Sequence, residues 1–407
     1  MVNVHIPPPL DATHKLHLMQ EDARFEVGSD ADAEALSSLP TAADPANAAV
    51  NAAAKIRSAP PPPTATKLML AGRCIFNCAY CGCRCGRDGR QDYLVTPSEL
   101  AHLAKATAEK SGIGVFLTSA IHQNADYTQE LLAESARILR QDLGYRGDLH
   151  VKVMPGADPM LIARSGQYAS RLSVNIEVAQ SSGYARIAKQ KTRQNILTPM
   201  GDIARQITAA KAEHRPFAVS QTTQLMAGST QEDDRRILTL SAALYRKYRL
   251  KRVYYTPFHY ENDAAGYETE HLPHVVTPRW RMARLYQADR LLQLYNFTPD
   301  DIAPADDPFL HEDIDPKAAW ALRNMDLFPM EVNTADFDML IRVPGIGITG
   351  AKRILEARRY CTLTHDVLRQ MHIQVNRCNC FIVCNGRYQG GISLDSPTLT
   401  RLHLALA

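Results

Sequence analysis

Strand-like and helix-like segments alternate along the middle of this chain, and the alternation constrains its fold more than any other feature. Short apolar runs recur six times between residues 67 and 257, with helical stretches between them. Strands that alternate with helices pair in parallel through right-handed crossovers. The sequence therefore predicts an α/β fold, with strands at 68–70, 114–119, 149–154, 171–178, 218–226 and 252–257.

Helix signals fill the intervals between these strands, and the first is the clearest. Thr96 stands before a proline at the first helical position, and its hydroxyl can cap the helix. The expected helices are 97–110, 127–139, 159–165, 181–190, 198–213 and 233–248, with another at 278–296 after the sixth strand.

Three cysteines follow the first predicted strand with the spacing C-x3-C-x2-C. They are Cys74, Cys78 and Cys81, on the loop at the carboxyl end of that strand. Thiolates are the usual ligands of iron–sulfur clusters, which normally take four. Three thiolates leave one iron open, and an open coordination position is typical of a catalytic metal site. The alternatives are a zinc knuckle or a disulfide, although zinc sites more often pair two C-x2-C motifs.

The cysteine stretch resembles the signature of radical S-adenosylmethionine (SAM) enzymes, C-x3-C-x-aromatic-C, with Tyr80 as the aromatic residue. The resemblance implies a [4Fe-4S] cluster on Cys74, Cys78 and Cys81, with S-adenosyl-L-methionine on the open iron and reductive cleavage to a 5′-deoxyadenosyl radical. It also implies a partial (β/α)6 barrel, an open relative of the TIM barrel, with its chemistry at the carboxyl ends of the strands.

Length and composition set broad limits on the chain. It has 407 residues, 45% of them hydrophobic and 22% charged, which is ordinary for globular domains. A formal charge of +3 gives no general attraction to polyanions. Nine cysteines without an export signal predict a reducing, cytoplasmic location. No apolar run reaches the length of about 18 residues that a membrane helix needs, so no membrane partner is expected.

Composition also predicts how the chain is divided. Residues 31–66 are rich in Ala, Asp, Ser and Pro, which bury little apolar surface and favour a linker. The expected segments are an N-terminal helical segment at 1–30, the low-complexity linker at 31–66, the barrel at 67–260, a helical extension and linker at 261–330, and a helix-hairpin-helix module with a tail at 331–407.

A second motif lies near the carboxyl end, where residues 340–355 form a predicted helix, a glycine turn and another helix. It resembles the helix-hairpin-helix modules of DNA repair enzymes and implies a C-terminal all-α domain. Gly345 and Gly347 allow a tight turn whose amides, with the positive end of the next helix, can hold a phosphate. Lys352 and Arg353 add charge toward the same backbone. The alternative is a hairpin that only packs or binds protein; the candidate nucleic-acid contacts are Pro344, Gly345, Ile346, Gly347, Lys352 and Arg353.

The two motifs in this order resemble a radical SAM family associated with DNA modification or repair and with a uracil-DNA glycosylase-like partner. The resemblance covers residues 15–30 and about 67–390, while the linker at 31–66 departs from it. It implies DNA as substrate, the glycosylase-like protein as a partner, and an electron donor such as flavodoxin or ferredoxin. The stretches that carry it are the hairpin and residues 148–156, 171–177, 197–201, 223–228, 250–255 and 285–289.

Polar residues near the expected strand ends are candidates for binding SAM. Ser119 stands where radical SAM enzymes usually contact the methionine amino group, with a satisfied turn hydroxyl as the alternative. Asn175 and Glu177 alternate with apolar residues; Glu177 would bind a ribose hydroxyl or form a buried pair with a basic residue. Lys152 and Arg193 would hold the SAM carboxylate or a substrate phosphate, with a surface salt bridge as the alternative for Arg193.

The remaining cysteines have no assigned role at this stage. Cys83 and Cys85 follow the triad, and the late group consists of Cys361, Cys378, Cys380 and Cys384. The late group would form a second cluster, a zinc site or free buried thiols. Two other readings of the whole chain stay open: a nucleic-acid-binding protein with a structural or redox-sensing cluster, and a radical SAM enzyme that acts on RNA or nucleotides.

Overall fold

The computed structural model describes residues 17–19, 65–85, 92–258, 277–390 and 401. The chain divides into a first unit, Met1–Glu232 with Ala243–Arg279, and a second unit, Asp233–Ala242 with Trp280–Ala407. The predicted N-terminal helical segment at 1–30 lies outside the described residues, except that 17–19 are helical. The predicted linker at 31–66 also lies outside them, except for its last two residues, which begin the first strand.

A six-stranded parallel sheet forms the centre of the first unit. Its strands are hydrogen-bonded in chain order, β1-β2-β3-β4-β5-β6, and every neighbouring pair is parallel. Strands in sequential parallel order are those of an α/β barrel segment, so the predicted partial (β/α)6 architecture is confirmed. The strands are β1 Ala65–Met69, β2 Gly114–Thr118, β3 Leu149–Lys152, β4 Arg171–Ser173, β5 Ser220–Ala227 and β6 Arg252–Pro257.

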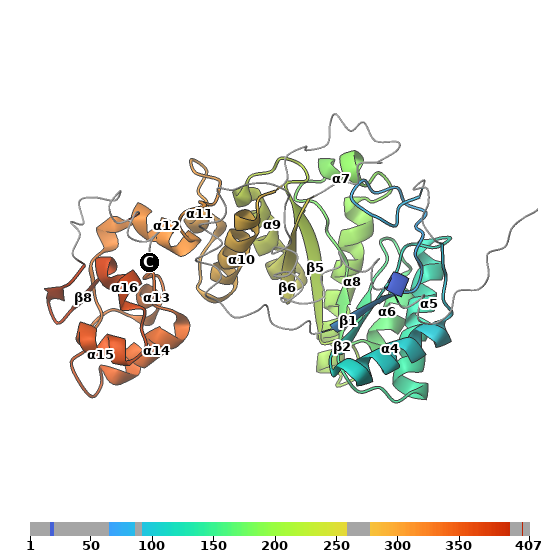
Figure 1. Ribbon diagram of the computed structural model, residues 1–407, viewed down its shortest axis with the longest axis horizontal. Coiled ribbons are helices and arrows are strands. Elements are labelled where there is room, and N and C mark those ends of the chain that lie inside the picture. Colours follow the sequence, from blue (N-terminus) through green and yellow to red (C-terminus); the bar gives the residue numbers. More distant parts are fainter. Residues whose placement is uncertain (1–16, 20–64, 86–91, 259–276, 391–400, 402–407) are drawn as a thin grey trace, which may run out of the picture. The chain divides into compact units, whose positions relative to one another are not determined.

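Helices cover the sheet because each crossover returns the chain to the same end (Figure 1). α4 packs on β1 and β2, α5 on β2 and β3, α6 on β3, and α8 on β5. The apolar residues of one register row across the first four strands are fully buried: Leu68, Leu117, Val151 and Leu172. The helical elements are α4 Pro97–Ser111, α5 Ala125–Arg137, the π-helix η2 Ile138–Asp142, α6 Pro159–Tyr168, α7 Ser182–Ile187, α8 Arg193–Ala212 and α9 Asp234–Tyr248.

Local capping explains where two of these helices begin. Thr96 caps α4 as predicted, and it forms a reciprocal capping box with Glu99. α8 begins at Arg193, five residues before the predicted start at 198, because Thr192 and Asn195 form another capping box. Pro199 therefore lies inside α8 and does not begin it.

β4 is shorter than the predicted strand at 171–178. The hydroxyl of Thr223 donates to the carbonyl of Val174 and accepts from the amide of Ile176, which replaces ladder hydrogen bonds beyond Ser173. Glu177 then has a φ of 62°, in the left-handed region that a strand does not use. The segment after β4 therefore turns out of the strand just where the predicted site residues begin.

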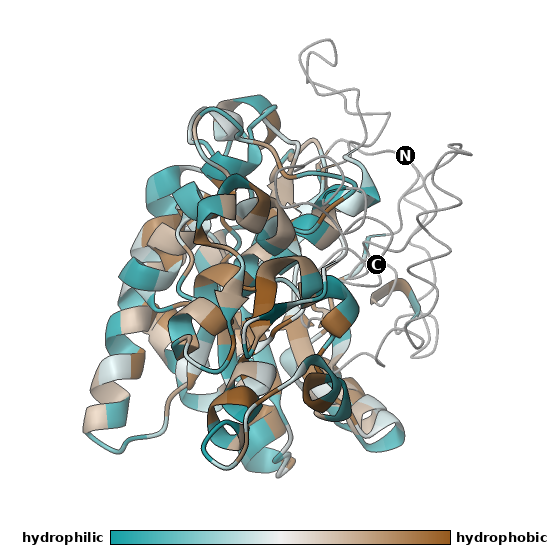
Figure 2. Ribbon diagram, turned by 90° about the vertical axis from the view of Figure 1, so that its left-hand side faces the viewer, coloured by the Kyte–Doolittle hydropathy of each residue, from teal (hydrophilic) through white to brown (hydrophobic). Residues whose placement is uncertain are grey.

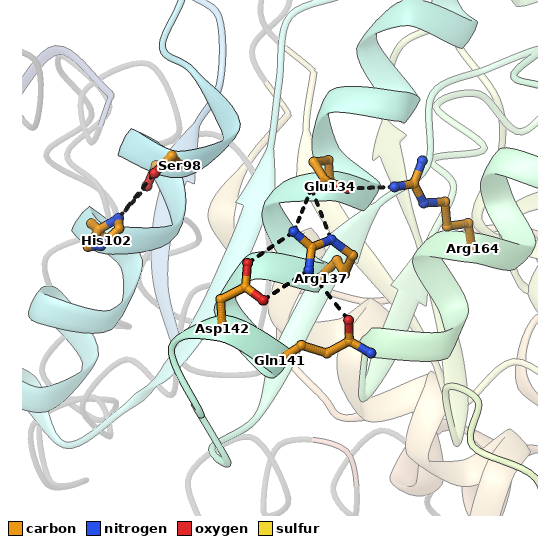
Figure 3. Close-up of polar contacts among 7 residues, drawn as sticks. All are labelled: Ser98, His102, Glu134, Arg137, Gln141, Asp142 and Arg164. Atoms are coloured by element: carbon orange, nitrogen blue, oxygen red, sulfur yellow. Dashed lines mark hydrogen bonds and ion pairs between the residues drawn. The ribbon is translucent and has the colours of Figure 1, made fainter.

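The outer helices of the first unit are joined by a network of charged side chains (Figure 3). Arg137 donates to Glu134 on its own helix at 2.8 Å and to Asp142 on η2 at 3.0 Å. Arg164 on α6 donates to the other carboxylate oxygen of Glu134. Because all four groups are partly solvated, this network contributes modestly to stability.

The second unit is mainly helical and contains one small sheet that the sequence did not predict. β7 pairs in parallel with β8, and β8 pairs antiparallel with β9. Its elements are α10 Arg279–Leu294, α11 Pro299–Ile302, α12 Pro316–Arg323, the 3-10 helix η4 Met325–Leu327, β7 Met330–Glu331, α13 Phe337–Leu340, α14 Ile348–Ala357, α15 His365–Gln370, α16 Val375–Cys378, η5 Asn379–Phe381, β8 Ile382–Cys384 and β9 Arg387–Tyr388.

An aromatic cluster forms part of the core of the second unit. Trp320 packs edge-on against Phe297 and Phe328, with ring centroids 5.4 and 6.3 Å apart, and Phe328 packs against Phe381 at 5.0 Å. Hydrophilic and hydrophobic residues alternate along the helical ribbons, as expected for helices with one buried face (Figure 2). Within the described ranges, no helix is both long and apolar enough to cross a membrane.

Candidate functional site

The cysteine loop follows β1 and is fixed to the carboxyl edge of the sheet. The amide of Leu70 donates to the carbonyl of Thr118 at the end of β2, and the amide of Ile75 donates to the carbonyl of Ile121. Inside the loop, the amide of Cys74 donates to the carbonyl of Cys83 at 2.7 Å. The predicted position at the carboxyl ends of the first strands is therefore the observed one.

Two backbone amides point at the sulfur of Cys74. Phe76 N donates to Cys74 Sγ at 3.3 Å and Ile121 N donates to it at 3.4 Å. Hydrogen bonds to sulfur stabilise a thiolate and tune the potential of iron–sulfur clusters. Even so, burial and the neighbouring Cys81 raise the pKa of the Cys74 thiol to about 11. Burial also raises the pKa of Cys78, to about 12.

The three thiols lie close enough to interact electrostatically. Cys78 interacts electrostatically with both Cys74 and Cys81. Cys74 and Cys81 also pack against a small buried cluster that contains Met69 and Ala120. No three His, Cys, Asp or Glu side chains of the described residues are arranged to hold a single metal ion. A four-iron cluster binds each thiolate through a different iron, so its ligands need not converge on one point. The donor set and its amide hydrogen bonds fit such a cluster.

A second segment contacts the cysteine loop. It consists of residues 187–191, at the end of α7 and just after it. The amide of Ala79 donates to the carbonyl of Ile187 at 2.9 Å, and the amide of Asn77 donates to the side chain of Gln190 at 3.3 Å. Lys191 then reaches the aromatic residue of the motif: its Nζ donates to the hydroxyl of Tyr80 at 3.0 Å. These contacts fix the loop to a segment other than the strands β1 and β2.

Lys191 forms a buried ion pair with Glu177. Its Nζ lies 2.6 Å from Glu177 Oε1, and the two side chains are only 12% and 4% exposed. Burial alone would lower the pKa of Lys191, but the Glu177 carboxylate and the sulfurs of Cys78 and Cys81 raise it above its usual value. The ammonium is therefore charged at neutral pH. Removing one partner of a buried pair typically costs about 3–5 kcal/mol.

The backbone holds the Glu177 carboxylate in this position. Glu177 adopts a φ of 62°, which costs free energy for a residue with a side chain. Its amide donates to the carbonyl of Gln224 at 3.0 Å, and its carbonyl accepts from the amide of Met226 at 2.8 Å. β5 thus maintains the turn that directs this carboxylate toward Lys191.

The other predicted SAM contacts are distributed unevenly around the site. Ser119 follows β2 beside the cysteine loop, and its hydroxyl donates to the carbonyl of Ala120 at 2.6 Å, as in the turn alternative. Lys152 ends β3 and Asn175 follows β4; both are buried at the carboxyl edge of the sheet. Arg193 is exposed at the first position of α8. Glu177 is engaged with Lys191, the buried pair that the sequence left open as its alternative.

Sequence reasoning missed Lys191 and Gln190. Both belong to the basic stretch Lys189 to Arg193, in which only Arg193 was selected. The available signal was the buried acidic residue at 177, which requires a nearby cation. No periodicity of the chain identifies which of the three basic residues supplies it.

The hairpin predicted at 340–355 is present in the second unit. α13 ends at Leu340, the turn follows, and Gly347 is the N-cap of α14, where it supplies no side-chain hydrogen bond. The first amides of α14 have no partners within the helix, as at any helix start. Gly345 has a φ of 84°, so the turn uses its glycine as predicted.

The six predicted hairpin contacts differ in exposure, and Gly345 is partly exposed. Ile346 and Pro344 are buried. Lys352 and Arg353 are exposed on α14, and Gly347 is partly exposed. Arg353 also donates to the carbonyl of Met371 at 3.1 Å, which gives it a structural contact in addition to the predicted one.

A second hairpin, which the sequence analysis missed, packs against the first. α15 and α16 flank a turn in which His372 has a φ of 56°, in the position that Gly345 takes in the first hairpin. An added Cβ on Gly345 would lie 2.8 Å from the carbonyl oxygen of Gln374, and one on Gly350 would lie 2.9 Å from Ile373. The two hairpins therefore form one closely packed pair. The second lacks a glycine turn, so it gave no sequence signal.

The late cysteines behave as free thiols in the structure. Cys378, Cys380 and Cys384 are buried and Cys361 is exposed, and none of the nine cysteines forms a disulfide. Burial raises the pKa of Cys378 and Cys384 to about 12. As noted above for the described residues, no single-ion site includes them.

No family model and no curated protein matches the chain. An X-ray structure of the FeFe-hydrogenase maturase HydG from Carboxydothermus hydrogenoformans matches with a TM-score of 0.42 at 15% identity, over 56% of this chain and 50% of that chain. A crystal structure of HydG, a maturase of the FeFe-hydrogenase, matches with a TM-score of 0.41 at 14% identity, over 70% and 62%. The chain thus spans 50% and 62% of the lengths of these proteins. Matches this weak assign no activity.

Proposed function

We propose that this chain is a radical SAM enzyme in which Cys74, Cys78 and Cys81 hold a [4Fe-4S] cluster and S-adenosyl-L-methionine binds its open iron. The observation that carries the proposal is the cysteine loop: three neighbouring thiols at the carboxyl edge of a parallel sheet, with two amides donating to one sulfur. α/β folds collect their chemistry at this edge. When bound, the cluster supplies the electron that cleaves SAM to a 5′-deoxyadenosyl radical.

The residues of the chain would bind and orient the reactants. The amides of Phe76 and Ile121 stabilise the Cys74 thiolate, and the ammonium of Lys191 adds positive charge beside the loop. Ser119 lies beside the same loop, where it would hydrogen-bond the methionine end of SAM. Buried Ala120 and its apolar neighbours keep water from this side of the site.

Anaerobic reconstitution of the full chain tests the cluster. We expect about four irons and four sulfides per chain, visible absorbance, and a change in the cluster spectrum when SAM is added. Cys78→Ser should lose the cluster, because a buried ligand is removed. Cys361→Ser is the matched control and should keep it, because Cys361 is exposed in the second unit.

The same preparation distinguishes the main alternative. A cluster with four protein ligands would form normally and show no response to SAM, as a structural or redox-sensing cluster would. Cys83 is an additional thiol, buried in the loop in the cluster against which Cys74 and Cys81 pack. If it were the fourth ligand, Cys83→Ser would create a SAM response that the natural chain lacks.

We infer further that the substrate is nucleic acid and that the reaction modifies or repairs DNA. The paired hairpins support this inference, because the α14 start offers unpaired amides beside the exposed Lys352. Residues 337–378 also contain seven Lys and Arg but only three Asp and Glu, although the whole chain is nearly neutral. Such a local excess of positive charge favours phosphate backbones.

A binding comparison tests the class of substrate. The full chain should bind duplex DNA more tightly than structured RNA of equal length, and single nucleotides weakly. A preference for RNA or for nucleotides would overturn the DNA assignment and leave the radical chemistry standing. Mass spectrometry of nucleosides after anaerobic reaction with damaged and undamaged DNA would then identify the product.

A further inference from the structure

So far the only role given to the buried pair of Lys191 and Glu177 is the positive charge that Lys191 places beside the cysteine loop. The two charged side chains contact each other at 2.6 Å, and Lys191 also donates to the hydroxyl of Tyr80 within the cysteine motif. Burying two charges away from water is expensive, and apolar residues often replace such pairs without loss of stability. A pair that contacts Tyr80, the residue between Cys78 and Cys81 in the motif, suggests an electrostatic purpose.

The two charges are not equally placed relative to the thiols. Lys191 interacts electrostatically with Cys74, Cys78 and Cys81, and at Cys78, where Glu177 also acts, the effect of Lys191 is the larger of the two. The pair is therefore neutral as a whole, but it presents its positive end to the sulfurs. In a buried setting such a field is only weakly screened.

We propose that Lys191 raises the reduction potential of the cluster on the cysteine loop, and that Glu177 limits this effect. The proposal rests on the proposed function. Reduction by an external one-electron donor adds one negative charge to the cluster and breaks no protein bond. A fixed cation nearby stabilises the reduced form, and a fixed anion destabilises it. The pair thus sets how strongly reducing an electron donor the enzyme needs.

A redox titration of the reconstituted protein without SAM tests the proposal, with the reduced cluster followed by electron paramagnetic resonance. Lys191→Met should shift the midpoint to a more negative potential. The expected size is about a tenfold change in the reduction equilibrium, or about 59 mV for one electron. Glu177→Gln should shift it in the opposite direction, because it removes the counter-charge and keeps the hydrogen-bonding shape. Lys191→Arg keeps the charge and should stay closer to the natural chain.

The opposite signs separate an electrostatic role from a structural one. If the pair only supported the loop, both variants would loosen the same contacts and shift the potential in the same direction, which would overturn the proposal. Unchanged midpoints in loaded variants would overturn it as well. Arg84 is another cation buried in the loop. It is kept in every variant, so a difference between the midpoints is not due to a change at Arg84. A natural chain that binds no cluster would instead overturn the proposed function itself.

Discussion

At the scale of single residues, backbone conformation decides more than side-chain chemistry in the hairpin pair. Gly345 meets two constraints together: its φ of 84° and the close approach of Gln374 O, 2.8 Å from where a Cβ would stand. Gly386 meets only the first, with a φ of 73° and no atom within 4 Å of the same point. The two glycines therefore allow conformational strain to be separated from steric overlap.

We predict that Gly345→Ala destabilises the second unit more than Gly386→Ala does. The left-handed conformation alone costs about 1 kcal/mol for alanine, and overpacking at Gly345 adds about 1–3 kcal/mol. Urea unfolding followed by tryptophan fluorescence measures this unit selectively, because both tryptophans, Trp280 and Trp320, belong to it. Equal losses in the two variants would mean that the hairpins do not pack as described.

At the scale of elements, one of the contacts between the first hairpin and α12 is made by a lysine. Lys317 donates from Nζ to the carbonyl of Ile346 at 2.6 Å, and its ammonium lies 5.0 Å from the ring centre of Tyr295. Burial lowers the pKa of Lys317 to about 7; Asp315 opposes this shift and Arg377 adds to it. Folding therefore releases a proton from Lys317 at mildly alkaline pH.

The stability of the second unit should therefore rise with pH across this window. Between about pH 7 and about pH 10.5 the unfolded chain binds a proton on Lys317 that the folded chain has lost, so the free energy of unfolding increases by up to about 1.4 kcal/mol per pH unit. Lys317→Met should have a flatter dependence in the same fluorescence assay. If the stability of the natural chain and of Lys317→Met depended on pH in the same way, Lys317 would not be the group responsible.

The sequence predicted most elements but not all of their ends, and the reasons are local. The six strands and their order followed from the alternation of apolar runs with helices. β4 ended early because the hydroxyl of Thr223, 49 residues away from Val174 in sequence, replaces its ladder hydrogen bonds. α8 began early because of a capping box at Thr192 that the proline at 199 obscured.

At the scale of the whole molecule, the three cysteines were predictable because their spacing is local, whereas their surroundings were not. Lys191 reaches Tyr80 across 111 residues of sequence, and no pattern within either segment indicates that contact. The second hairpin escaped detection for another reason. His372 takes a left-handed conformation that glycine usually marks. Composition likewise hid the local excess of positive charge at 337–378 within a nearly neutral chain.

That local excess makes the salt dependence of DNA binding the sharpest test of the molecule as a whole. Each phosphate neutralised by a cationic side chain releases counterions, so the logarithm of affinity falls linearly with the logarithm of salt concentration. Lys352→Ala should weaken duplex binding for all sequences alike and reduce this slope by about one, because an exposed lysine contacts phosphate and not base edges. Lys251→Ala, at an exposed position in the first unit, is the matched control and should change neither. If Lys352→Ala left the slope unchanged, the hairpin pair would be a packing or protein-binding element, and DNA would have to be held elsewhere.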